Sequence, residues 1–385
     1  MALKFLTAGE SHGCALVGVI EGMPAGLALT AEHLQAQAAR RKLGFGRGNR
    51  QKIETDEVRI LSGVRRGFTL GSPIALLIEN RDFANWRDVM RVEPARGEAR
   101  RRVDVPRPGH ADLGGALKYR HQDMRDVLER ASARETAMRV ALGSAARRLL
   151  EGLGVALGSR VAALGPVADD SDYGDVKTLN ARADRSPVRS LRRSREMVAF
   201  IDGARGAGDT VGGVIEVVAG SVPTGLGSYA QWDRRIEGPI ASAFMSLNGV
   251  KGVEIGLGFG AAGRPGSKAH DEYAPAPAGR VRFLSNRSGG IDGGITTGQD
   301  LVVRAAMKPL ATLMRPLRSV DLRTGKSASA HIERSDVCAV PSAAVIGEAL
   351  LALVLASAVL DKFGGDSMDE LLPRVRQWRK TGTSI

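Results

Sequence analysis

The feature that most constrains the fold of this chain is a long apolar stretch near its C-terminal end, from Ala343 to Leu360. The stretch contains Glu348, has polar flanks and is only marginally long enough to cross a bilayer. Pro341 suits the first turn of a helix, and Gly364 and Gly365 suit its end. We therefore predict a helix buried in the core of a soluble protein rather than a membrane span.

Other segments predict further helices and strands around this core. Thr30 can cap a helix that runs to about Arg41, and Gly44 can end it. Ser132-Ala133-Arg134-Glu135 has the form of a capping box that opens an Ala- and Leu-rich helix to about Leu150. Strands are predicted at residues 58–61, 74–78, 213–219, 252–260 and 301–306. No low-complexity linker divides the chain, so we predict one α/β unit whose Gly-rich loops gather at a site.

The chain is basic, with a formal net charge of +13 and a pI near 10.2. A basic protein attracts polyanions, so a nucleic-acid-binding protein is one hypothesis. The basic residues are dispersed, however, with no zinc-finger spacing, no basic region with heptads and no run of aromatic residues between basic ones. A nucleotide-dependent kinase is a weaker alternative, because the Gly-rich loop at 44–50 lacks the Lys-Ser/Thr ending of a P-loop. A site for an anionic small molecule explains the charge equally well.

Two histidines lie in turns shaped by glycine and proline. His12 stands within Gly9-Glu10-Ser11-His12-Gly13, and His110 follows Arg107-Pro108-Gly109. Glycine lets a backbone approach a ligand closely, so these turns favour acid–base chemistry on a small molecule. A structural histidine bonded to the backbone is the alternative at both positions. The other histidines give weaker signals. His33 and His331 have contexts that favour a structural or surface role, and His121 and His270 are ambiguous.

Several arginines lie beside turns or helix starts: Arg41, Arg47, Arg107, Arg134 and Arg334. Each alone is typical of a solvated surface, but together they indicate a multiply charged anionic ligand, because guanidinium groups match carboxylate and phosphate. Asp336 is a candidate general base, and the alternative is that it caps the next helix. Ser11 and Ser132 show no Ser-His-Asp arrangement and are predicted to be hydrogen-bonding groups. Cys14 and Cys338 form no metal-spaced cluster, so no metal site is predicted.

An ordered set of motifs resembles the chorismate synthase family. Three segments carry the match: GESHG at 9–13, ERASARET at 129–136 and RSDVCAVP at 334–341. Four shorter segments lie between them: GFGRG at 44–48, RPGHAD at 107–112, VKGVE at 250–254 and MKP at 307–309. They span nearly the whole chain in the family's order, which makes the resemblance specific.

The resemblance implies the last step of the shikimate pathway. In that step 5-enolpyruvylshikimate 3-phosphate loses phosphate and a ring proton in an anti-1,4-elimination that gives chorismate. The family requires reduced FMN although the reaction has no net redox change. Whether the chain reduces its flavin with NADPH or relies on an external reductant is left open. A substrate with two carboxylates and a phosphate accounts for the arginines better than nucleic acid does.

The resemblance also implies roles for single residues. His12 would assist the departing phosphate, His110 would protonate or stabilise the reduced flavin, and Asp336 would act with flavin N5 on the ring proton. Ser11 and Ser132 would support this network. Substrate contacts are expected at four arginines: Arg47, Arg107, Arg134 and Arg334. FMN contacts are expected at Arg130, Ala131, Ser132, Asn248, Gly249, Gly293, Lys308, Pro309, Leu310, Ala311, Thr312 and Arg334. Positions associated with NADP are Arg41 and Arg47.

The family fold is a β-α-β sandwich, with long helices packed between antiparallel sheets. The resemblance implies a single domain over residues 1–385, with mobile loops near 44–52, 82–112 and 286–299. It also implies a homotetramer, a cytoplasmic location and no nucleic-acid or membrane partner.

Overall fold

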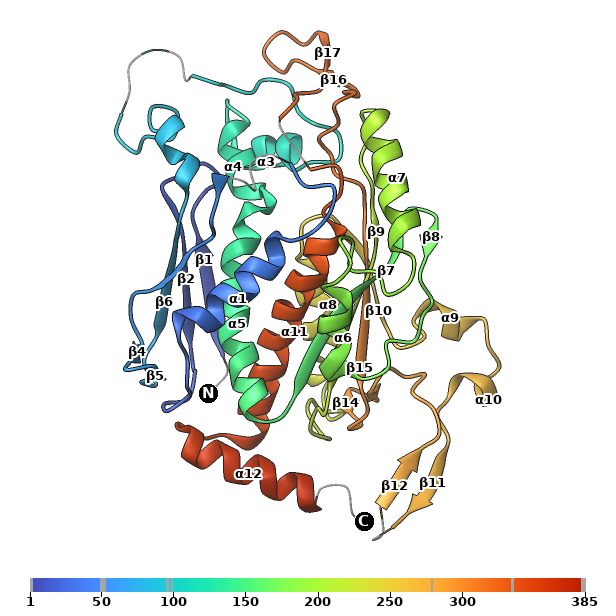
Figure 1. The fold of residues 1–385 in the computed structure, drawn as a ribbon. Coiled ribbons are helices and arrows are strands. Elements are labelled where there is room, and N and C mark those ends of the chain that lie inside the picture. The colour runs from blue at the N-terminus through green and yellow to red at the C-terminus, as the bar shows by residue number, and fades with distance from the viewer. Residues whose placement is uncertain are drawn as a thin grey trace.

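Two antiparallel sheets lie on either side of a layer of long helices in the computed structural model (Figure 1). The structure describes residues 3–48, 53–94, 97, 100–277, 280–333 and 336–381. The first sheet has the order β1 (Lys4–Ala8), β2 (Ala15–Glu21), β6 (Ile74–Glu79), β3 (Val58–Ile60). The second has the order β10 (Val250–Ile255), β15 (Leu301–Met307), β9 (Gly213–Gly220), β7 (Ala156–Leu164), β8 (Val167–Ala168).

Three helices form the layer between the sheets: α1 (Ala31–Lys42), α5 (Thr136–Gly152) and α11 (Val340–Phe363). α5 packs on the first sheet and on α11, which in turn packs on β7 and β9 of the second sheet. The two long helices approach closely, because a Cβ placed on Gly143 would come within 2.5 Å of the Ala349 Cβ. Side chains from both sheets and all three helices therefore belong to one continuous hydrophobic core.

The C-terminal apolar stretch is the central core helix, as predicted. Among the described residues, α11 is the one helix long and apolar enough to cross a membrane by composition, but 83% of its most apolar window is buried inside the protein. Pro341 lies in its first turn, and Gly364 follows its last residue with φ of +62°. A helix that is apolar on every side needs such complete enclosure by other elements.

One buried carboxylate joins the helix layer to the second sheet. Glu348 of α11 accepts hydrogen bonds from Arg40 of α1 at 2.8 and 2.9 Å and from Ser159 of β7 at 2.5 Å. It also pairs with Arg147 of α5 and with Arg189, which lies 3.5 Å away. Burial alone would raise the pKa of Glu348, but the arginines hold it well below its usual range. The charge that made the apolar stretch unlike a membrane span is thus fully paired in the core.

The starts of α1 and α5 differ in how they match the expected caps. Thr30 caps α1 as predicted, and its backbone N–H donates to His33 Nδ1 at 3.1 Å. The capping box at Ser132 was only half right. The Ser132 hydroxyl accepts from the Arg134 N–H and opens a short 3-10 turn, η2 (Ala133–Glu135), before α5 begins. Glu135 pairs with Arg139 at 3.0 Å instead of reaching back to Ser132.

Most predicted strands are present, with one clear error. The predicted strand at 252–260 ends at Ile255, because Gly256 has φ of +59° and starts a turn into the short helix α9 (Phe259–Ala262). The Gly-rich segment at 286–299, predicted as a loop, contains a small hairpin of β13 (Ile291–Asp292) and β14 (Ile295–Thr296). Such short elements form because backbone N–H and C=O groups need hydrogen-bond partners, and the pattern of apolar residues does not predict them.

The remaining elements surround these layers. The helices are η1 (Arg81–Asn85), α3 (Asp112–Tyr119), α4 (Arg125–Ala131), α6 (Val176–Ala183), α7 (Ser194–Gly206), η3 (Trp232–Arg234), α8 (Glu237–Met245), α10 (Gly266–Ala269) and α12 (Met368–Thr381). The strand pairs are β4 (Val64–Arg65) with β5 (Phe68–Thr69), β11 (Tyr273–Ala276) with β12 (Arg280–Phe283), and β16 (Arg318–Val320) with β17 (Ser327–Ser329). In Figure 1, α3 and α4 lie at the same end of the layered core as β16 and β17.

Candidate active site

The predicted serines and the first histidine meet where the β1–β2 turn contacts the end of α4. The Ser11 hydroxyl donates to Ser132 Oγ at 3.0 Å, and the Ser11 N–H donates to the carbonyl of Glu129 at 2.8 Å. Both carboxylate oxygens of Glu129 lie 2.9 Å from His12 Nδ1, and one accepts the His12 backbone N–H at 2.8 Å. Two segments more than a hundred residues apart therefore hold His12 in place.

The imidazole of His12 also stacks on an aromatic ring. The ring centroids of His12 and Trp86 are 3.8 Å apart, with an interplanar angle of 19°. The guanidinium groups of Arg101 and Arg125 lie 4.2 and 5.1 Å from the Trp86 centroid. His12 and Trp86 are both buried, so this stack is shielded from solvent. The ring of His12 is consequently restrained in its plane as well as at Nδ1.

The second histidine lies in a charged loop before α3. His110 Nδ1 is 2.5 Å from Asp112 Oδ1, and Arg107 donates to both oxygens of Asp112 at 2.8 and 3.0 Å. Arg107 also donates to Thr312 Oγ1 at 3.0 Å. Burial alone would raise the pKa of Asp112, but His110 and Arg107 hold it far below its usual range. An ionised carboxylate therefore fixes both His110 and Arg107.

Two of the predicted arginines share carboxylates beside the end of α4. Arg134 pairs with Asp56 and with Glu54 at 3.3 Å, and it donates to Asn80 Oδ1 at 2.9 Å. Arg41 lies 3.3 Å from the other oxygen of Asp56. Burial lowers the pKa of Arg41 to about 10, and the attraction of Asp56 opposes that shift. Both arginines are oriented by protein carboxylates before any ligand binds.

The GFGRG loop contacts the segment that carries Asp336. Asp336 lies 3.3 Å from Arg47 Nη1 and accepts the Gly48 N–H at 2.6 Å. Arg47 Nη1 also donates to Ser342 of α11 at 2.7 Å, while its buried Nε has no hydrogen-bond partner among the described residues. Gly46 has φ of +91°, and a Cβ there would lie 3.0 Å from the Cys338 Cβ. Glycine at this position lets the loop pack directly on the start of α11.

A third set of contacts links the end of α4 to the His110 loop. Asn248 donates to the carbonyl of Ala131 at 3.0 Å, while its own buried Oδ1 finds no hydrogen-bond partner in the described ranges. The Lys308 N–H donates to the carbonyl of Gly249 at 2.9 Å, and the Lys308 ammonium contacts the carbonyl of Gly109. Burial and the nearby Lys251 lower the pKa of Lys308. The expected flavin residues of three segments thus lie next to one another.

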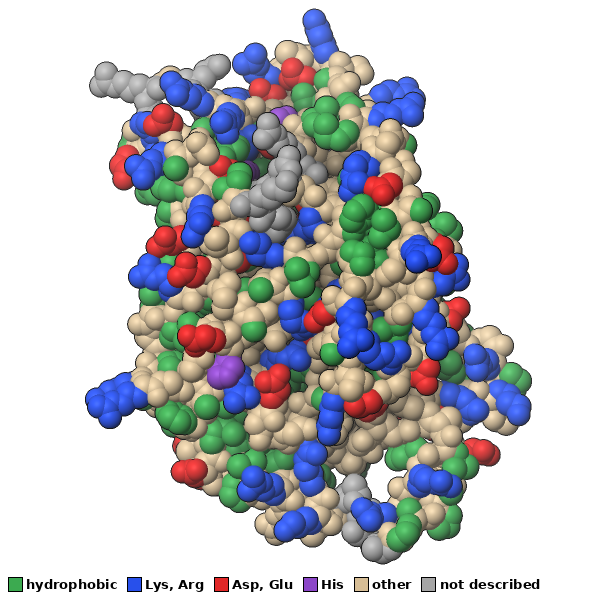
Figure 2. All heavy atoms as spheres, viewed as in Figure 1, with side chains coloured by type: hydrophobic (Ala, Val, Ile, Leu, Met, Phe, Trp, Pro, Cys, Tyr) green, Lys and Arg blue, Asp and Glu red, His purple; other side chains and the backbone are tan. Residues whose placement is uncertain are grey.

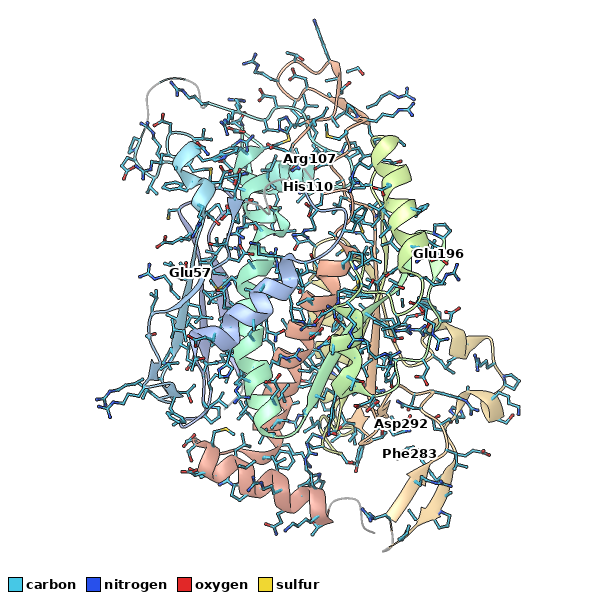
Figure 3. The ribbon with its side chains drawn as sticks, viewed as in Figure 1. Glu57, Arg107, His110, Glu196, Phe283 and Asp292 are labelled. Atoms are coloured by element: carbon cyan, nitrogen blue, oxygen red, sulfur yellow. The ribbon has the colours of Figure 1, made fainter. Side chains whose placement is uncertain are left out.

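Not every predicted site residue joins this cluster in the same way. Arg130 is tied to the β1–β2 end, where it donates to the carbonyls of Gly9 and Thr7 at 2.9 and 3.0 Å. Gly293 lies in the turn between β13 and β14. Figure 3 places the preceding residue, Asp292, at the opposite end of the molecule from His110. Gly293 therefore stands apart from the other expected flavin contacts of its own chain. Arg334 lies outside the described residues.

Sequence reasoning missed several residues of the cluster. Glu129 and Asp112 lie inside the recognised motifs, but nothing in their spacing shows which histidine each would hold. Trp86 gave a weak signal, because it is one of three tryptophans in the chain and lies in a segment interpreted as surface. The other histidines with bland contexts have local partners: His33 caps α1, and His331 lies 3.1 Å from Glu333.

The structure gives no sign of a metal site or of a continuous basic surface among the described residues. Across the described ranges, no group of three or more His, Cys, Asp or Glu side chains is placed to hold a metal ion. Figure 2 shows Lys and Arg side chains scattered among Asp and Glu on the visible face instead of gathered in one stripe. The arginines near the histidines are paired with carboxylates, so the strongest positive groups of the site are held in position by negative ones.

Comparison with known proteins identifies the family. The chorismate synthase family model matches residues 3–360. Chorismate synthase from Desulforudis audaxviator is 56% identical over 378 residues, covering 98% of this chain and 97% of that protein. The enzyme from Geobacillus kaustophilus is 50% identical over 383 residues, covering 98% and 99%. A crystal structure of a chorismate synthase matches 99% of this chain and 98% of that chain, with a TM-score of 0.80 and 40% identity. This chain belongs to the chorismate synthase family.

Proposed function

We propose that the cluster around the end of α4 is the active site of a lyase acting on a phosphate ester. The reaction is that of the family: anti-1,4-elimination of phosphate and a ring proton from 5-enolpyruvylshikimate 3-phosphate to give chorismate. The observation that carries the proposal is the joint placement of Ser11, His12 and Ser132 in one hydrogen-bonded group, beside paired arginines. Such a group offers proton donors and fixed positive charge to a leaving phosphate.

The arginines would bind the anionic substrate. Arg134 and Arg41 share Asp56, and Arg107 shares Asp112 with His110, so each guanidinium is held in one orientation. A preorganised donor loses little conformational freedom when a carboxylate or phosphate arrives. Arg47 would complete the set, because its buried Nε has no partner within the part of the chain that the structure describes. We assign substrate contacts to Arg47, Arg107 and Arg134, and to Arg334 by its place in the motif.

The two histidines and Asp336 would handle protons at different points. His12 would donate to the phosphate as it leaves. Asp336 would accept the ring proton, with Arg47 and the Gly48 N–H stabilising its charged form. His110, held by Asp112, would stand on the flavin side of the site. Ser11 and Ser132 would keep the β1–β2 turn joined to α4 while these transfers occur.

The residues present fit a flavin mononucleotide. Reduced FMN would supply electron density to the substrate while phosphate leaves. The buried Oδ1 of Asn248, which no described residue hydrogen-bonds, is an acceptor of the kind a ring N–H requires. Lys308 supplies a positive charge, and Thr312 supplies a hydroxyl beside Arg107. Four remaining expected contacts flank these groups in sequence: Gly249, Pro309, Leu310 and Ala311. The other three belong to the end of α4, where the Ala131 carbonyl accepts from Asn248: Arg130, Ala131 and Ser132.

Assembly, location and reductant are further parts of the proposal. A contact between Gly293 and this flavin would require a second copy of the chain, because Asp292, its neighbour in sequence, lies at the opposite end of the molecule from His110 in Figure 3. The family's tetramer would allow such a contact, and a cytoplasmic location follows from a soluble biosynthetic role. NADPH would be used by way of Arg41 and Arg47. Anaerobic NADPH oxidation by the purified protein with FMN would decide whether it reduces its own flavin.

The test of the function is phosphate release under anaerobic conditions. Purified protein with dithionite-reduced FMN should release phosphate from 5-enolpyruvylshikimate 3-phosphate, and oxidised FMN should support none. No release with reduced FMN would refute the proposal. The nucleic-acid hypothesis predicts instead a retained complex with DNA or RNA at physiological salt, with a steep salt dependence and no effect of flavin.

A further inference from the structure

Glu129 contacts His12 in a way that goes beyond ordinary packing. One of its oxygens accepts the His12 backbone N–H at 2.8 Å, and both oxygens lie 2.9 Å from Nδ1 of the ring. The carbonyl of the same residue accepts the Ser11 N–H. A single residue of α4 therefore fixes the backbone and the side chain of the β1–β2 turn together.

The charge on Glu129 decides which ring nitrogen of His12 carries a proton. Burial alone would raise the pKa of Glu129, but hydrogen bonds from His12 and Arg125 lower it overall. Arg125 lies 3.0 Å from Glu129 and 3.0 Å from Glu333. An ionised carboxylate can only accept hydrogen bonds, so Nδ1 of His12 must be the protonated nitrogen.

The second nitrogen of His12 is left available. In the described part of the chain, the hydrogen bonds of the His12 ring are made through Nδ1. Trp86 covers the ring face at 3.8 Å, and Arg101 stacks on Trp86 at 4.2 Å. A half-turn flip of the imidazole would break the Nδ1 contacts, and a partial rotation would break the stack, so the direction of Nε2 is fixed as well.

We propose that Glu129 and Trp86 are positioning residues that keep Nδ1 of His12 protonated and hydrogen-bonded, so that Nε2 is the nitrogen that carries the second proton of the imidazolium and passes it to the leaving phosphate. The proposal rests on the proposed role of His12 at the leaving phosphate. Glu129 sets the tautomer, and Trp86 sets the plane of the ring. Neither residue needs to touch the substrate.

Replacement of Glu129 by glutamine tests the tautomer. Both oxygens of Glu129 lie 2.9 Å from Nδ1, so in either orientation the amide of Glu129→Gln places an NH2 group in place of one acceptor of Nδ1–H. If it keeps the backbone bond, its NH2 group faces Nδ1 and favours the Nε2–H form. We expect the ring-nitrogen NMR shifts of His12 to change to that form. We also expect kcat for phosphate release to fall on the order of 10²-fold, with KM little changed.

Three further variants separate positioning from general damage. Glu135→Gln removes another buried carboxylate of the same segment, one that pairs with Arg139 and not with His12, and should leave kcat unchanged. Trp86→Leu should lower kcat by less than Glu129→Gln while the Nδ1–H form persists. Glu129→Ala should recover part of its lost activity when formate is added, because a small carboxylate can enter the space left by the side chain.

The outcomes are distinguishable from failure of the proposed function. Absence of phosphate release by the unmodified protein would refute the proposed function, whereas the ring-nitrogen shifts need no turnover. An Nδ1–H signal in Glu129→Gln equal to that of the unmodified protein would overturn the assignment of Glu129. Equal losses in Glu129→Gln and Glu135→Gln would also overturn it, because they would show only a general effect of removing buried charge.

Discussion

The buried carboxylate of α11 gives the sharpest prediction about stability. Glu348→Gln keeps the size of the side chain and removes its charge. The Glu348 side chain is 2% exposed. The arginines that surround it are also buried, with exposed fractions of 3% for Arg189, 13% for Arg147 and 14% for Arg40. Removal of one partner from a buried ion pair costs about 3–5 kcal/mol, because the remaining charges stay desolvated. We expect the free energy of unfolding to fall by about that amount.

A neighbouring glutamate provides the matched control. Glu151 pairs with the same Arg147 at 2.8 Å and with Arg148 at 3.5 Å, but its side chain is 37% exposed. Exposed pairs contribute about 0.5 kcal/mol, so Glu151→Gln should be nearly neutral. Both variants would be compared by urea unfolding at one protein concentration, since any assembly makes the midpoint depend on concentration.

The pH dependence separates a charge effect from a packing effect. The pKa of Glu348 is depressed in the folded state, so its contribution is fully present above the unfolded pKa of about 4.3 and is lost as pH falls. The gap between the unmodified protein and Glu348→Gln should therefore be constant near neutral pH. Below about pH 4 it should narrow by about 1.4 kcal/mol per pH unit. A Glu348→Gln variant as stable as Glu151→Gln, or a gap that widens in acid, would refute this reasoning.

Other parts of the structure give three further predictions. Gly143→Ala should lower the melting temperature, because the added Cβ would overlap Ala349 at a cost of about 1–3 kcal/mol. The control Gly203→Ala in α7 adds a Cβ in open space and should raise the melting temperature. Equal shifts would contradict the close contact between α5 and α11. Asp112→Asn should destabilise the folded protein more at pH 7 than at pH 3. The pKa of Asp112 is depressed in the folded state, so the stabilisation by its carboxylate is lost as pH falls. Thermal unfolding at both pH values measures the difference. His110→Ala should lose most phosphate release with an unchanged circular dichroism spectrum, and near-normal turnover would remove His110 from the catalytic set.

The elements with strong local signals were predicted well from the sequence. Thr30 at the start of α1, Pro341 in the first turn of α11 and the apolar run after it each specify a local conformation directly. The prediction at 252–260 was wrong because glycine fits an apolar strand pattern by composition, yet Gly256 takes a positive φ that turns the chain.

The candidate site was predictable as a set of residues but not as a geometry. Motif order gathered His12, His110 and Asp336 into one hypothesis, and the structure ties each to a different partner. The pairing of His12 with Glu129 spans 117 residues, and that of Arg107 with Thr312 spans 205. Contacts at such separations are set by how distant segments of the chain pack together, which no local pattern encodes.

The contact between the GFGRG loop and the segment before α11 has an entropic consequence. The Val337 N–H donates to the carbonyl of Gly46 at 2.8 Å, and Asp336 accepts the Gly48 N–H. An anion that immobilises Arg47 therefore also restricts the motion of Asp336, although the two lie 289 positions apart in sequence. The Arg47 loop and the Asp336 segment become ordered together. A first ligand that orders them therefore leaves less conformational entropy to be lost when a second ligand binds. Cooperative binding at this site needs no change of shape, only a shared loss of motion.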